Sequence, residues 1–127
     1  MGFQTHAREQ YNAYIALVKI YPRFMDCLYP KYMLLCNCIE LSLKAVLLRN
    51  KLYTPPELKR KFGHNIDKLA EEVNKLMSSP NFNKNEIEVI NVLSLYHKNR
   101  LFTYPETGTK TLPVLIDVVN ICERLVW

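Results

Sequence analysis

Polar side chains that could do chemistry interrupt an otherwise apolar helical pattern at three places. Glu40 precedes Lys44 by four residues, the order that favours an ion pair along a helix. His64 follows Gly63 at a predicted helix start. Arg100 stands where an apolar line of a later helix would continue, so we expect its guanidinium to point toward the core or a cleft. Carboxylate, imidazole and guanidinium groups bind ions and move protons, which makes these residues candidates for a site.

The neighbours of Arg100 allow a functional and a structural interpretation. In the functional one, Arg100 clamps a phosphate, Tyr104 stacks on a base one turn later, and His97 donates or accepts a proton one turn earlier. In the structural one, Arg100 pairs with Glu40 and holds two helices in register. The structural interpretation is favoured, because buried arginine is seldom left without a carboxylate. The Glu40 and Lys44 pair is expected to be a structural polar pair, acting as surface support for its helix.

One connector is strongly basic. Between positions 49 and 61 the only acid is Glu57, so the local net charge is +4; the basic residues are Arg49, Lys51, Lys59, Arg60 and Lys61. With His64 and the exposed N–H groups of a helix start, Lys59, Arg60 and Lys61 would form an anion site. The alternative is a solvated loop that keeps the protein soluble, with His64 packing against or capping the turn.

The elements that must hold these residues are all helical. Apolar residues at 7, 11, 14, 18, 21 and 25 predict a first helix with a kink or break at Pro22 and an end at Tyr29-Pro30. A second helix, from about 31 to 48, has apolar residues on more than one side, which is typical of a central helix. A short basic helical turn is predicted over 54–61, with proline in its first turn. Another helix is predicted over 65–77, with Asn65 as its N-cap. Two more follow over 84–103 and from about 111 to the C-terminus. The fold class is therefore all-α, a bundle of four long helices with one or two additional short helices.

Length and composition predict one cytoplasmic domain over residues 1–127. The most apolar stretch, 33–48, is shorter than the roughly 20 residues of a membrane span, and the N-terminus lacks the features of a signal peptide. We therefore expect no membrane partner. The four cysteines include no Cys-x-x-Cys pair and the three histidines lie at no spacing typical of zinc sites. Buried reduced thiols, no metal and no cofactor are the expectation.

Three segments resemble the HEPN superfamily, the higher eukaryotes and prokaryotes nucleotide-binding domains. They are 38–45, with Glu40 and Lys44; 63–69, which begins Gly-His-Asn; and Arg100 with Tyr104-Pro105. The resemblance implies a four-helix bundle that often dimerises and often acts in RNA metabolism, in toxin–antitoxin or defence systems, or beside a nucleotidyltransferase. Active HEPN ribonucleases carry an arginine followed a few residues later by a histidine. Here Arg100 matches the arginine, but Pro105 occupies the nearest histidine position.

The resemblance and the residues together predict a non-catalytic HEPN-like binding module that forms a homodimer. Its ligand would be RNA, a nucleotide or a partner protein such as a nucleotidyltransferase or an antitoxin. The residues expected to bind the ligand are Lys59, Arg60, Lys61, His64, Arg100 and Tyr104. One alternative is a divergent metal-independent ribonuclease or toxin in which His97 or His64 acts with Arg100. Another is a purely structural bundle that interacts only with protein.

Overall fold

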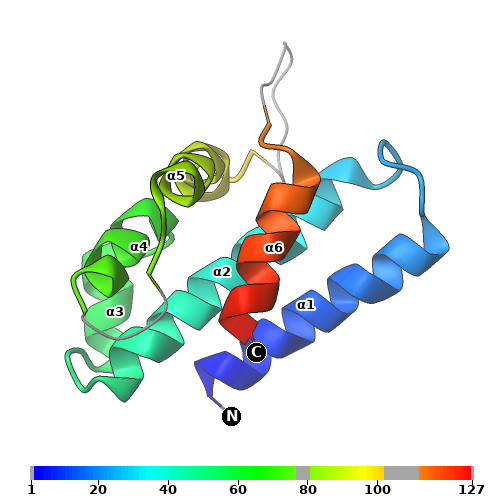
Figure 1. Cartoon of the computed structure of the whole chain (residues 1–127). Helices are drawn as coiled ribbons and strands as arrows, with labels where there is room; N and C mark the ends of the chain where they lie inside the picture. The colour runs from blue at the N-terminus through cyan, green and yellow to red at the C-terminus, as the bar shows by residue number, and fades with distance from the viewer. Residues whose placement is uncertain (1, 77–80, 102–111, 127) are drawn as a thin grey trace.

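The computed structural model describes residues 2–76, 81–101 and 112–126, and within these ranges the chain forms six α-helices and no strand (Figure 1). The helices are α1 (Phe3–Ile20), α2 (Leu28–Arg49), α3 (Pro55–Phe62), α4 (Ile66–Asn74), α5 (Lys84–Lys98) and α6 (Leu115–Val126). The prediction of an all-α fold is confirmed. None of the described helices combines the length and the apolar character needed to cross a membrane.

Helix α2 is the central element of the bundle. It packs most extensively against α1 and also contacts α4, α5 and α6. Figure 1 shows α3, α4 and α5 on one side of α2, with α6 crossing it between α5 and α1. Leu35, Ile39, Leu43 and Leu47 repeat every four residues along α2 and are fully buried. Burying each such side chain stabilises the fold by roughly 1.5–3 kcal/mol, so this row anchors the surrounding helices.

The first helix is shorter than its apolar pattern predicts. Ala7, Tyr11 and Tyr14 are buried as expected, but α1 ends at Ile20, and Met25 is exposed. The predicted break at Pro22 is confirmed, because proline lacks an N–H group and disfavours helical geometry in the residue before it. The prediction that the first helix ends at Tyr29-Pro30 is wrong. Pro30 lies in the first turn of α2, where proline is tolerated.

The turn between α3 and α4 positions His64. Helix α3 begins with a capping box in which the Thr54 side chain accepts from Glu57 N and the Glu57 side chain accepts from Thr54 N. It ends at Gly63, whose φ of +55° lies in the region that favours glycine. The chain reverses there and enters α4 two residues after His64. The imidazole thereby lies between α3 and α4, and α4 packs against α2.

Helix α5 brings a second histidine to the same place. It starts with a capping box formed by Asn83 and Glu86 and ends at Lys98, earlier than the predicted end near 103, which lies outside the described residues. His97 is in the last turn of α5. Arg100 follows the helix end with a φ of +56°, so it no longer follows the helical spacing from which its direction was predicted.

Candidate functional site

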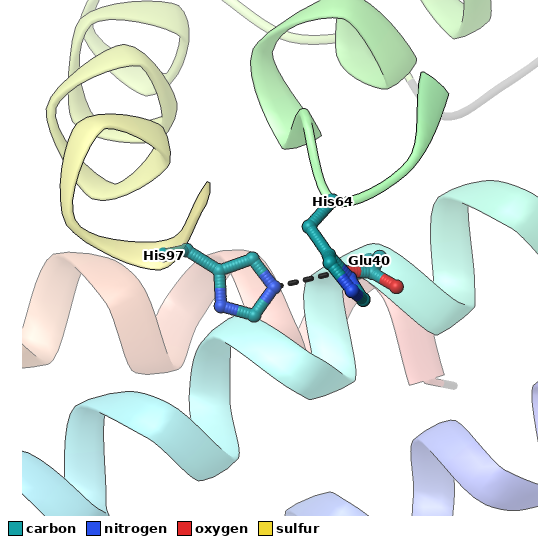
Figure 2. A group of neighbouring side chains, drawn as sticks. All are labelled: Glu40, His64 and His97. Carbon is teal, nitrogen blue, oxygen red and sulfur yellow. Dashed lines mark hydrogen bonds and ion pairs between the residues drawn. The ribbon is translucent and has the colours of Figure 1, made fainter. Parts of the chain in front are cut away.

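A single buried carboxylate gathers side chains from three parts of the chain. Glu40 Oε1, in the middle of α2, lies 2.7 Å from His97 Nε2 and 2.9 Å from His64 Nδ1 (Figure 2). Its other oxygen, Oε2, accepts a hydrogen bond of 3.0 Å from Lys44 Nζ one turn along α2. We call Glu40, Lys44, His64 and His97 the Glu40 cluster. It ties α2 to the turn before α4 and to the end of α5.

The donors around Glu40 keep its carboxylate charged. Burial raises the pKa of Glu40, but the hydrogen bonds from His97, His64 and Lys44, together with the attraction of the Lys44 ammonium, lower it to about 2. The carboxylate is therefore ionised at neutral pH and can only accept hydrogen bonds. It follows that the ring nitrogens facing it, His64 Nδ1 and His97 Nε2, each carry a proton when they make these bonds.

The cluster is buried on one side and open on the other. The side chains of Glu40, Lys44 and His97 are 9%, 10% and 10% exposed, whereas that of His64 is 55% exposed. The two imidazole rings meet edge to face, with centroids 5.8 Å apart. His64 is thus an imidazole at the surface whose inner nitrogen is oriented by a buried carboxylate. Such a pair can exchange a proton with a bound molecule.

Arg100 does not take part in this arrangement. Its side chain is exposed, and the Glu40 carboxylate is contacted by His97, His64 and Lys44 instead. The prediction that Arg100 points inward and pairs with Glu40 is therefore wrong. The physical reason is that α5 has ended, so the histidine one turn earlier faces α2 in place of the arginine. Tyr104, predicted to stack on a base, lies outside the described residues.

The basic residues of α3 do face solvent. Lys59, Arg60 and Lys61 are exposed, while Leu58 and Phe62 of the same helix are buried. In the described ranges, no hydrogen bond or ion pair involves the Lys59 ammonium. Lys61 Nζ donates to Tyr53 Oη at 3.0 Å, a hydrogen bond that raises the pKa of Lys61. We call Lys59, Arg60 and Lys61 the α3 basic surface.

The N–H groups at the start of α4 have acceptors within the protein. Three such bonds are Asn65 N to Phe62 O at 2.9 Å, Ile66 N to His64 O at 3.1 Å and Asp67 N to Ser94 Oγ at 3.4 Å. The Asn65 side chain makes no capping hydrogen bond, contrary to its predicted role. These three N–H groups are therefore not open to an anion.

The sequence identified the residues of the Glu40 cluster and one of its contacts, that of Glu40 with Lys44, but not the contacts of the two histidines. The ion pair expected between Glu40 and Lys44 is present, although both side chains are buried rather than at the surface. His64 was expected either to pack against or cap the turn or to join Lys59, Arg60 and Lys61 in an anion site, and His97 to accompany Arg100. One signal could have joined them: a carboxylate on a helix buried on several sides needs donors, and one lysine leaves its second oxygen unsatisfied.

Comparisons of the chain with protein-family models, with curated proteins and with solved structures found no match. The resemblance to HEPN domains therefore stays a prediction from the sequence segments. Two of those segments contact one another through the Glu40 cluster, because Glu40 and Lys44 come from the first and His64 from the second.

Proposed function

We propose that this protein is a non-catalytic, HEPN-like module that binds RNA through the α3 basic surface, with His64 at its edge. The observation that carries the proposal is the run of three exposed cations on one short helix, next to a half-exposed imidazole. Lysine and arginine side chains that neutralise phosphates supply most of the sequence-independent affinity for nucleic acid. RNA is favoured over a single nucleotide because several adjacent cations match the successive phosphates of a chain better than the phosphate group of one nucleotide.

The Glu40 cluster supports this surface. By bonding to His64 Nδ1, Glu40 fixes the turn that joins α3 to α4. That turn sets the direction of α3, so the buried carboxylate acts as a positioning group for the exposed cations. RNA would then meet a surface that is already formed, which lowers the ordering cost of binding.

The absence of catalysis in this proposal follows from where the histidines lie. His97 is largely buried with Nε2 on Glu40, and Arg100 is exposed beyond the helix end. A divergent ribonuclease is the second candidate, favoured by one observation: Glu40 orients the half-exposed ring of His64, as a carboxylate orients a general base. It ranks lower because His64 has no second exposed histidine in the cluster to act as the matching acid.

The test is a measurement of single-stranded RNA binding by fluorescence anisotropy at several salt concentrations. Changing Lys59, Arg60 and Lys61 to glutamine should weaken binding and reduce the slope of log affinity against log salt by about 2, since each phosphate contact in a single strand contributes about 0.7. A matched control changes three exposed lysines elsewhere to glutamine, namely Lys19, Lys75 and Lys84.

The control separates a site from general charge. The α3 variant should lose affinity while the control variant, with the same change in net charge, keeps most of it. Equal losses in both variants, or no RNA binding by the unmodified protein at low salt, would contradict the proposal.

A further inference from the structure

We propose that Glu40, His64 and His97 form a binding site for a divalent transition metal ion whose donor set suits Zn²⁺. Each residue offers one ligand atom, and Glu40 Oε1, His64 Nδ1 and His97 Nε2 all lie within 4.8 Å of one another. The inference goes beyond RNA binding and does not rest on it, because the three ligands lie in the Glu40 cluster rather than on α3.

The donor set fits the chemistry of zinc. Two imidazole nitrogens and one carboxylate oxygen are ligands that Zn²⁺ accepts, and zinc sites with three protein ligands keep a fourth position for water or a bound molecule. The half-exposed His64 borders solvent, which gives a metal ion and a fourth ligand a route to the site. Glu40 and His97 are held from inside by α2 and α5.

A tetrahedral metal site requires both imidazole rings to shift from their present positions. Bonds of about 2.0–2.2 Å in a tetrahedral site place neighbouring ligand atoms about 3.3 Å apart. Glu40 Oε1 now lies 2.7 Å from His97 Nε2 and 2.9 Å from His64 Nδ1, so both separations must lengthen by about 0.5 Å. The two nitrogens lie within 4.8 Å of each other, so they must approach by up to about 1.5 Å. His64 can make most of this movement, away from Glu40 and toward His97, because its side chain is exposed and follows Gly63 in a turn. When neutral rings coordinate the metal, each ring proton passes to the opposite nitrogen, so no net charge change is required of the histidines.

Lys44 shapes the site from outside the ligand set. It holds Glu40 Oε2, which leaves Oε1 for the metal, and ligating carboxylates are commonly hydrogen-bonded in this way. The positive charge of the Lys44 ammonium also repels a metal ion bound at Glu40. We therefore expect weaker binding than in structural zinc sites built from anionic cysteines.

The experiment is calorimetric titration of the reduced, metal-free protein with Zn²⁺, repeated with Co²⁺ as a visible-absorption probe. All proteins carry Cys27→Ser, because Cys27 is a partly exposed thiol that could itself bind zinc. We expect one equivalent to bind saturably. His64→Ala and His97→Ala should each lower the affinity at least about tenfold, since loss of even an outer-shell partner has effects of that size.

The third histidine provides the matched control. His6 lies on α1 with Glu9 3.8 Å away, so His6→Ala removes an imidazole beside a carboxylate outside the cluster and should leave the affinity unchanged. His64→Ala is expected to fold because its side chain is half exposed, and circular dichroism checks this. No saturable binding by the Cys27→Ser protein, an affinity that both cluster variants leave unchanged, or an equal loss in His6→Ala would overturn the proposal.

Discussion

The Glu40 cluster and the α3 basic surface use similar side chains in opposite ways. In the cluster, one carboxylate receives hydrogen bonds from a lysine and two histidines; Glu40 and Lys44 are buried and the His97 side chain is largely buried. On α3, three adjacent cations face solvent. Charged side chains therefore have two separate consequences in the Glu40 cluster and on α3. Buried charge that is fully paired holds helices together, whereas exposed charge is available to a ligand.

Position on the helix decides which of the two applies. Glu40 and Lys44 lie on α2, which has neighbours on several sides, so their charges can be buried only with partners. Lys59, Arg60 and Lys61 lie on the outer side of a short helix that buries Leu58 and Phe62. Changes in the cluster should therefore alter stability, while changes on α3 should alter binding.

The largest expected effect on stability comes from Glu40→Gln. The substitution keeps the shape of the side chain but removes its charge, which leaves the buried Lys44 ammonium without a counter-ion. Breaking a buried ion pair in this way destabilises by about 3 kcal/mol. Urea denaturation should show this fall in the free energy of unfolding.

An exposed carboxylate gives the control for Glu40. Glu88→Gln on α5 should change the free energy of unfolding by less than about 0.5 kcal/mol. Similar small effects for both substitutions would mean that the Glu40 cluster does not hold the helices together.

A smaller difference is expected between the two histidines, which bond to the same oxygen. His97→Ala should lower the free energy of unfolding by about 2 kcal/mol, because it empties a largely buried site and leaves Glu40 with one donor fewer. His64→Ala should cost less than about 1 kcal/mol, since water can replace its half-exposed ring. Thermal and urea unfolding of both variants would measure the difference. A larger loss of unfolding free energy for His64→Ala than for His97→Ala would show that burial does not govern how much each histidine contributes to stability.

The sequence predicted the helices better than it predicted the contacts. The two-sided apolar pattern of α2 identified the central helix, and the spacing of Glu40 and Lys44 identified their pairing, because both depend on positions close in the chain. The histidines are 24 and 57 residues from Glu40, so no helical periodicity connects them. Only the demand of a buried carboxylate for donors points to them.

Helix ends account for the wrong predictions. Arg100 was assigned to the inner side of α5 by extending the spacing of earlier residues, but the helix stops at Lys98 and the backbone of Arg100 adopts a positive φ. The break at Pro22 was predicted, but the apolar stripe was extended beyond it to Tyr21 and Met25, which lie after the end of α1 and are exposed. In both places one local change of backbone direction moved a side chain from the expected core position to the surface.

The smallest expected effect is on RNA itself: the purified protein should not cleave RNA in the presence of a chelator. General acid–base catalysis contributes about a hundredfold to ten-thousandfold, and it needs a proton-transferring group at the bound phosphate. Arg100 stays charged and cannot shuttle protons, and His97 is turned toward Glu40. His64 is the imidazole of the cluster that reaches solvent, so gel assays should compare the unmodified protein with His64→Ala and His97→Ala. Cleavage that persists through purification and is lost in His64→Ala, with folding unchanged, would show that the pairing of Glu40 with His64 serves catalysis as well as stability.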